Sequence, residues 1–415
     1  MFTRVLSRIA VAGMLSLTML GGLPALAQHD PRPPAFPAAT STPAATAATA
    51  SSAETRSLGE VRSFTVEGQP MAISPDGKWL AGPGADRDFC IWDVTTLDPR
   101  CATDRKPMSV QLETITWAPD SSAVAFSLDA ARLFIDSDIY VMDIDGALHD
   151  LTDDGDDDKL DFGSTGKEIP VDMYPAWSPD SSQLAFARTV WGGDARPTII
   201  YTIDRDGGEP VERFVVSPQE PFIIYSPLHW LGDGSIVFSV LHADPGNTQN
   251  GVWRLTASGG VKRVIAGDAS AEIPTPFVND VSPDGTVATV FSMSRWAQYA
   301  TDGEPVYFLV NLESGEITPL EIDRQNPVDR VASVGTFLPG SDVSVALELN
   351  GNIRTAVLFD RTGALMSSVE LPEDAVGPAS NRGFSVADDG TVFMSTVATE
   401  DRSKRGGIIF TIAEP

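Results

Sequence analysis

Residues 174–186 have the sequence YPAWSPDSSQLAF, and this stretch decides the fold because its pattern recurs along the chain. An apolar strand ends at Trp177-Ser178, a turn follows at Pro179-Asp180-Ser181, and a second apolar strand returns. Proline fixes φ at the start of the turn, aspartate accepts hydrogen bonds from it, and the next position accommodates a positive φ. The stretch therefore predicts a tight antiparallel hairpin.

The turn pattern occurs seven times, at intervals of 44 to 60 residues. The copies lie at 73–77, 117–121, 177–181, 230–234, 281–285, 337–341 and 386–390. In each unit a third strand follows, and in the first six units it ends at a further turn, commonly with glycine, before a short fourth strand. Four antiparallel strands in about fifty residues form one blade of a β-propeller. We predict an all-β fold, a single propeller of seven four-stranded blades; six or eight blades stay open, because the last two copies are degenerate.

The ends of the repeat region favour a closed ring. The seventh unit has only three strands and ends near residues 408–412. A strand at residues 62–66 precedes the first unit and has no place in it. We expect this strand to complete the last blade, because closure of that kind removes the exposed strand edges that invite aggregation.

These residues resemble the TolB-type propeller repeat. Its signature is a Pro-x-Trp-Ser-Pro-Asp-Gly turn, then an apolar strand, then Ile-Tyr-x-Met-Asp. The best matches are residues 174–186 and 138–146, and the resemblance covers residues 57–415. It implies a propeller fold. It implies no single activity, because such repeats occur in envelope scaffolds, in lyases and in the gating domains of peptidases.

The N-terminal residues are typical of an exported protein. In residues 1–27, two arginines precede an apolar run and Ala25-Leu26-Ala27 provides a cleavage site, which predicts a signal peptide; an uncleaved anchor is the alternative. Residues 28–56 are rich in proline, alanine and threonine and predict a disordered linker, followed by the propeller at 57–415. We expect a periplasmic, extracellular or cell-surface protein with no membrane span in the mature chain.

Charge and cysteine content narrow the partners and the compartment. The formal net charge is −28, and such a chain repels nucleic acid and anionic lipid surfaces. The charge therefore excludes nucleic acid and suits a basic or neutral partner. We expect an envelope or extracellular protein or peptide as partner, and a monomer. Cys90 and Cys101 are the only cysteines, and in an exported protein this pair predicts a disulfide.

Candidate binding residues lie on the face opposite the repeated turns. In a propeller the loops from second to third strand share that face, and here they are long. Aromatic and arginine side chains in variable loops are typical binding anchors. The predicted binding residues on this long-loop face are Arg188, Trp191, Asp194, His242, Arg295, Trp296 and Tyr299.

The sequence favours binding over catalysis. It has no G-x-S-x-G nucleophile elbow, and turn formation explains the repeated aspartates. We predict a non-catalytic protein- or peptide-binding module. The alternative is a propeller enzyme or carbohydrate-binding protein that uses the central funnel, with Asp194 or His242 as acid/base. We expect no cofactor; calcium is a weak alternative, with Asp156, Asp158 and Asp161 as its candidate ligands.

Overall fold

The computed structural model describes fifteen segments of the chain. They are residues 57–86, 88–102, 110–128, 137–154, 169–191, 197–217, 226–242, 244, 246–292, 307–320, 333–350, 353–371, 376–378, 384–397 and 405–413. All of them belong to the unit formed by residues 54–415. The predictions of a signal peptide and a linker therefore lie outside the described residues.

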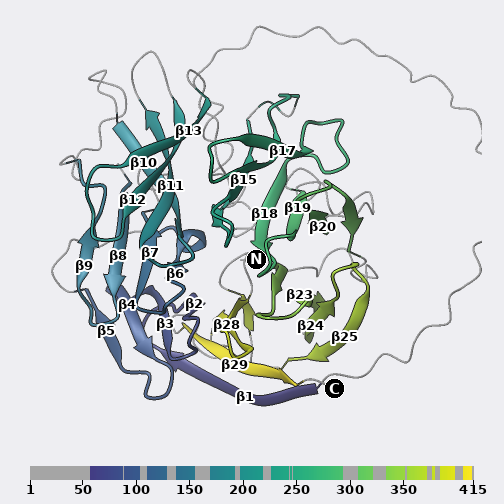
Figure 1. Cartoon of the computed structure of the whole chain (residues 1–415). Coiled ribbons are helices and arrows are strands. Elements are labelled where there is room, and N and C mark those ends of the chain that lie inside the picture. The colour runs from purple at the N-terminus through teal and green to yellow at the C-terminus, as the bar shows by residue number, and fades with distance from the viewer. Residues whose placement is uncertain are drawn as a thin grey trace, which may run out of the picture. The chain divides into compact units, whose positions relative to one another are not determined.

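The described strands form seven antiparallel sheets that surround a common centre (Figure 1). Six sheets keep chain order from the innermost to the outermost strand. Blade 1 contains β2 (Ala72–Ile73), β3 (Trp79–Pro83), β4 (Phe89–Asp93) and β5 (Pro99–Cys101). Blade 2 contains β6 (Thr116–Trp117), β7 (Ala123–Ser127), β8 (Ile139–Asp143) and β9 (Leu148–Asp150). Blade 3 contains β10 (Ile169–Trp177), β11 (Gln183–Trp191), β12 (Thr198–Asp204) and β13 (Val211–Ser217). A short 3-10 helix, η2 (Leu112–Thr114), precedes β6.

The remaining blades follow the same plan. Blade 4 contains β14 (His229–Trp230), β15 (Ile236–Val240), β16 (Gly251–Leu255) and β17 (Val261–Ala266). Blade 5 contains β18 (Pro276–Val281), β19 (Val287–Ser292), β20 (Tyr307–Asn311) and β21 (Ile317–Pro319). Blade 6 contains β22 (Ser333–Phe337), β23 (Ser344–Asn350), β24 (Ile353–Phe359) and β25 (Leu365–Glu370). The prediction of an all-β propeller with seven blades is confirmed.

Blade 7 joins the two ends of the described chain. Its strands are β26 (Val376–Pro378), β27 (Ser385–Val386), β28 (Thr391–Val397), β29 (Arg405–Ala413) and β1 (Ser57–Val66). Both β26 and β27 pair with β28, so they share the innermost position. β1 pairs antiparallel with β29 and is the outermost strand. The prediction that an N-terminal strand completes the last blade is confirmed.

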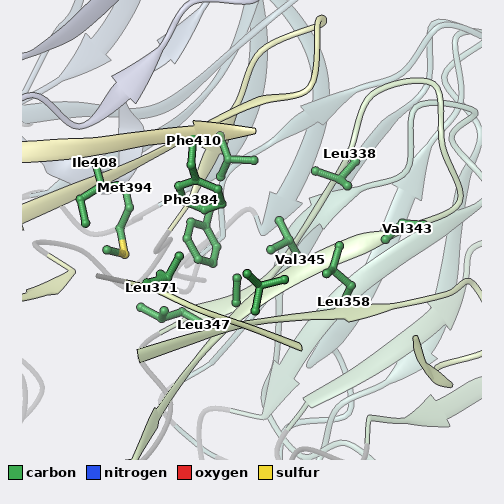
Figure 2. Close-up of a cluster of buried hydrophobic side chains, with 13 residues drawn as sticks. Leu338, Val343, Val345, Leu347, Leu358, Leu371, Phe384, Met394, Ile408 and Phe410 are labelled. Atoms are coloured by element: carbon green, nitrogen blue, oxygen red, sulfur yellow. The ribbon is translucent and has the colours of Figure 1, made fainter. Parts of the chain in front are cut away.

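The hydrophobic core is divided among the contacts between neighbouring blades. Alternate residues of a strand point to opposite faces of its sheet, and here both faces are covered by another blade. In β7, Val124 and Phe126 pack toward blade 1, whereas Ala123 and Ala125 pack toward blade 3. Figure 2 shows the cluster between blades 6 and 7, where Leu347 and Leu358 lie near Phe384, Met394 and Phe410. Strands covered on both faces, such as β7 and β15, are therefore apolar along almost their whole length instead of alternating with polar residues.

Candidate functional site

The innermost strands of the seven blades surround a central channel. Two adjoining cavities occupy it, of about 400 Å³ and about 490 Å³, and Trp117, His229 and Pro283 line both. The wall runs from residues that precede the inner strands, such as Met71, to the turns that follow them. Most lining side chains are apolar or aromatic, with a few polar groups among them. A pocket of this kind is the default binding site in a propeller of undetermined function.

The rim of the channel on the side of the repeated turns has a regular construction. The third residue of every motif copy lines one of the two cavities. Five of these seven residues are proline, and blade 4 contributes Gly232. In blade 7 the position belongs to Asp388, the only ionisable residue among the seven, all of which are described. One carboxylate therefore interrupts a rim that otherwise lacks charge.

The tryptophans of the motif tie the inner strands together. The indole Nε1 of Trp117 donates to the carbonyl of Ala72 in blade 1 at 3.3 Å. In the same way, Trp177 donates to Thr116 of blade 2 at 3.1 Å. These bonds fix the wall of the channel before any ligand arrives, and they commit both indole donors to the protein itself.

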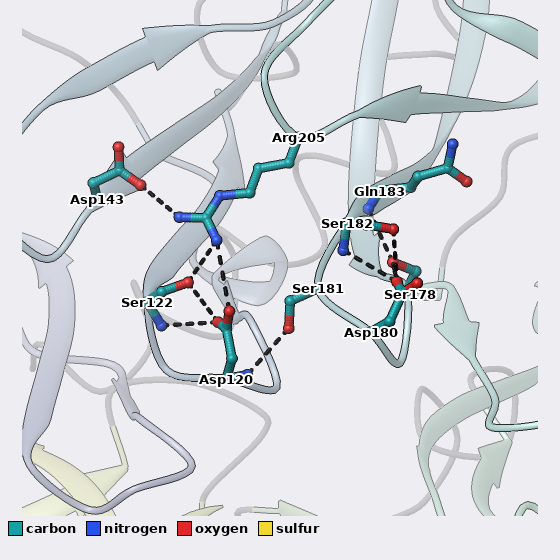
Figure 3. Close-up of polar contacts among 9 residues, drawn as sticks. All are labelled: Asp120, Ser122, Asp143, Ser178, Asp180, Ser181, Ser182, Gln183 and Arg205. Atoms are coloured by element: carbon teal, nitrogen blue, oxygen red, sulfur yellow. Dashed lines mark hydrogen bonds and ion pairs between the residues drawn. The ribbon is translucent and has the colours of Figure 1, made fainter.

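The turn aspartates are structural, as the sequence predicts. Figure 3 shows Asp120 and Asp143 of blade 2 beside the guanidinium of Arg205 from blade 3. Arg205 contacts Asp143 at 2.8 Å and lies 3.7 Å from Asp120. In the next turn, hydrogen bonds from Ser178 and Ser182 lower the pKa of Asp180 to about 2. The carboxylates of Asp120 and Asp180 thus bond within their own turns, and Asp120 and Asp143 also hold an arginine of the neighbouring blade.

Two serines replace the usual turn glycine and connect consecutive turns. Both lie in the left-handed region of the backbone, Ser121 with a φ of 60° and Ser181 with a φ of 62°. The Ser121 hydroxyl accepts a hydrogen bond from the backbone N–H of Asp76 at 2.9 Å. The Ser181 hydroxyl accepts one from Asp120 at 3.1 Å. These contacts between blades explain why a residue with a side chain occupies a position that favours glycine.

Among the described residues, two carboxylates line the channel. Asp280, on β18, accepts hydrogen bonds from the backbone N–H groups of Phe337 at 2.8 Å and Val281 at 2.9 Å. Asp388 lies at the rim, where partial burial and the carboxylates of Asp389 and Asp76 raise its pKa. None of the described residues that line the two cavities is lysine or arginine. The channel therefore offers a negative electrostatic environment to a ligand.

Arg188 is the predicted binding residue whose surroundings are best described. It lies on β11 opposite Asp172 of β10, and its Nε and Nη2 donate to the two carboxylate oxygens at 2.6 and 2.5 Å. Asp172 is only 1% exposed. The guanidinium also lies 5.4 Å from the centre of the Tyr201 ring. This side chain is committed to an ion pair within its own blade, and its role in binding stays a prediction.

The other predicted binding residues are only partly described. His242 lies in the loop after β15, where its Nδ1 accepts a hydrogen bond from the backbone N–H of Asp244 at 2.9 Å. Trp191 ends β11, and nothing is described of its side chain. The remaining predicted binding residues and the calcium candidates lie outside the described residues; these are Asp194, Arg295, Trp296, Tyr299, Asp156, Asp158 and Asp161.

The two cysteines form a disulfide. Cys90 on β4 pairs in register with Cys101 on β5, and their sulfurs are bonded. Asp88 lies beside them, and these three residues are the only described group of His, Cys, Asp and Glu side chains close enough to share a metal ion. A disulfide sulfur is not a thiolate and does not ligate metal as one. The group is therefore a poor metal site.

The sequence analysis did not predict three polar residues of the channel, Asp280, Asp388 and Ser395. Asp388 could have been found, because it stands where five of the other motif copies have proline. Nothing in the sequence distinguishes Asp280 or Ser395, since neither belongs to the motif. Ser395 lies on β28, is 4% exposed and lines the cavity of about 400 Å³. Only the arrangement of blades brings these three side chains to one cavity.

Comparison with known proteins gives the fold and no closer relationship. No family model matches the chain, and no curated protein matches it. Among solved structures, an oligogalacturonate lyase from Vibrio parahaemolyticus has a TM-score of 0.53 at 12% identity, covering 86% of this chain and 98% of that one. An oligogalacturonate lyase in complex with manganese has a TM-score of 0.52 at 11% identity, with coverages of 87% and 98%.

TolB structures are also among the matches. TolB from Acinetobacter baumannii has a TM-score of 0.41 at 16% identity, covering 74% of this chain. This chain spans 62% of the length of that structure. The propeller fold that the TolB-type repeats predict is confirmed by the seven sheets of the described chain. Among the described residues, no helix is long and apolar enough to cross a membrane.

Proposed function

We propose that the protein is a non-catalytic module that binds a protein or peptide of the cell envelope or the extracellular space. The observation that carries this proposal is the preformed channel, with its rim of prolines and its wall of apolar and aromatic side chains. Surfaces of this composition suit an extended peptide, because they offer apolar contact together with a few fixed polar groups.

The wall of the channel is fixed before binding. Contacts from Trp117 and Trp177 join neighbouring inner strands, and the Ser385 hydroxyl accepts a hydrogen bond from the Ile73 N–H at 3.1 Å. A rigid site loses little conformational entropy when a ligand binds, which favours affinity. This rigidity supports recognition of a flexible partner segment by a preorganised surface.

Export is part of the proposal. The disulfide agrees with an oxidising compartment, where such bonds persist. We propose that residues 1–27 direct export and are removed, that residues 28–56 act as a linker, and that the mature protein is a monomer. N-terminal sequencing of the protein from the host's envelope and medium, with its mass in solution, tests these points.

Affinity capture from envelope and culture extracts tests the binding function. The purified protein serves as bait beside two variants, Trp191→Ala/Trp296→Ala on the long-loop face and Asp388→Asn on the channel rim. A partner retained by the unaltered bait and lost with one variant supports the function and locates the face. A bait that retains nothing specific argues against a binding module.

A propeller enzyme or carbohydrate-binding protein is the alternative. Its acid/base candidates are Asp194 and His242, and the imidazole of His242 accepts a hydrogen bond within its own loop. Turnover of an oligosaccharide or lactone panel, abolished by His242→Ala, would establish the alternative. Absence of turnover together with a captured partner would favour the binding module.

A further inference from the structure

We propose that the turn side of the channel selects a cationic side chain of the bound peptide, a lysine ammonium or an arginine guanidinium, and that Asp388 holds it. This inference rests on the proposed peptide-binding function and names the residue class that the site prefers. It is carried by the position of Asp388 in the rim, by the charge of the channel wall and by a buried hydroxyl in the same cavity.

The rim contains a single charged residue at its repeated position. Proline contributes apolar rings without an N–H donor, and five of the seven rim positions are proline. Gly232 contributes backbone alone. Asp388 is exposed at the rim and is the one rim side chain able to form an ion pair. A slim apolar chain that ends in a cation matches such a rim, because its methylene groups contact proline while its charged end reaches the carboxylate.

The surroundings of Asp388 add to the attraction for a cation. The backbone N–H of Asp388 donates to the Pro75 carbonyl at 2.7 Å, which places its turn against that of blade 1. Partial burial raises the pKa of Asp388, and the nearby carboxylates of Asp389 and Asp76 raise it further. Lys78, in the turn of blade 1, pairs with Asp76 at 3.1 Å. No ion pair of the described residues involves Asp388, so its carboxylate is available to a ligand.

The wall of the channel has the same sign of charge. Asp280 lines the cavity, and the described lining residues include no lysine or arginine. The whole chain has a formal net charge of −28. A cleft with walls of one charge concentrates ligands of the opposite charge. An anionic ligand would meet repulsion both at the rim and along the wall.

Ser395 is an independent sign that the cavity receives a ligand. It is 4% exposed and lines the cavity that Asp388 borders. Its hydroxyl has no hydrogen-bond partner in the part of the chain that the structure describes. Buried polar groups normally have a partner. We assign this hydroxyl to the backbone of the bound peptide, beyond the residue whose cation reaches Asp388.

Selection from a display library of random heptapeptides tests the inference on the full-length purified protein. We expect enriched peptides to contain lysine or arginine at one common position. One such peptide and its analogue with norleucine in place of the basic residue are then labelled and titrated by fluorescence anisotropy. We expect the analogue to bind about tenfold more weakly, because it lacks one hydrogen bond to a charged group.

Asp388→Asn and Asp389→Asn form a matched pair of variants. Asp389 belongs to the same turn and accepts a hydrogen bond from the Thr391 N–H at 2.9 Å, but it does not line the cavity. We expect Asp388→Asn to weaken the basic peptide about tenfold and the norleucine analogue hardly at all. Asp389→Asn removes a neighbouring charge but no contact with the ligand, so it should weaken the basic peptide less than threefold and leave the norleucine analogue unchanged. Thermal unfolding of each variant checks that the propeller is intact.

The outcomes separate the inference from the function on which it rests. Enriched peptides without basic residues, or equal binding of the basic peptide by Asp388→Asn and the unaltered protein, would overturn the cation site and leave peptide binding in place. If no peptide is enriched and none competes for the channel, both the proposed function and this inference fail.

Discussion

Ser121 provides a sharp test of the contacts between blades. It is 6% exposed, has φ of 60°, and accepts a hydrogen bond from the N–H of Asp76 in the preceding blade at 2.9 Å. Ser121→Ala removes the bond and keeps the unfavourable backbone, so we expect a loss of about 1–2 kcal/mol in the free energy of unfolding. Ser121→Gly removes the same bond but relieves roughly 1 kcal/mol of left-handed strain, so its net loss should be no more than about 1 kcal/mol.

Urea unfolding followed by tryptophan fluorescence measures both variants. Gly390→Ser is the control, because Gly390 has the same turn position in blade 7, with φ of 82° and no atom within 4 Å of an added Cβ. There a serine gains strain without a partner, and we expect a loss of roughly 1 kcal/mol. The reasoning is refuted if Ser121→Ala matches the unaltered protein while Ser121→Gly is more stable by about 1 kcal/mol, since the hydroxyl would then contribute nothing.

Four further predictions concern stability. Asp172→Ala should cost about 3–5 kcal/mol in urea unfolding, because it leaves a partly buried guanidinium without its carboxylate; a loss below about 1 kcal/mol would contradict this. Partial burial tends to raise the pKa of Asp284, but hydrogen bonds from hydroxyls of its own turn outweigh it and lower this pKa to about 2. Its stabilising contribution is complete above the unfolded pKa of 3.8 and is lost as pH falls toward 2, so the urea midpoint should fall more steeply with acid in the unaltered protein than in Asp284→Asn. Replacement of Cys90 and Cys101 by alanine should cost about 3 kcal/mol, given their sequence separation of 11, and an unchanged urea midpoint would contradict it. A chelator should leave the thermal midpoint unchanged, whereas a fall reversed by added calcium would establish a calcium site.

The blade plan could be predicted from the sequence because its signals are local. A turn such as Pro75-Asp76-Gly77 depends on backbone preferences within a few residues, and the apolar strands on either side indicate which segments are buried. Ring closure could be predicted as well, since an unassigned strand at one end complements a blade lacking a strand at the other. The pairing of β1 with β29 is the expected result.

The channel site could be predicted only in small part. The long loops suggested one face of the propeller, and two of the residues chosen there, Arg188 and His242, make contacts within their own blades. Residue type alone made Arg188 resemble a binding anchor. The sequence does not show that Asp172, sixteen residues earlier, lies directly opposite it in a buried ion pair.

The repeat, the blade composition, the closing strand and the disulfide pair follow from the sequence without any structure. Tertiary structure alone decided that Asp388 faces the channel with Asp280 and Ser395, and that Ser121 bonds to the turn of the preceding blade. Hairpins and strand patterns are governed by the conformations of neighbouring residues, which the sequence displays directly. The contacts of Ser121 and Ser181 with the preceding turns join residues 45 and 61 positions apart, and their geometry follows only when the blades are packed against one another.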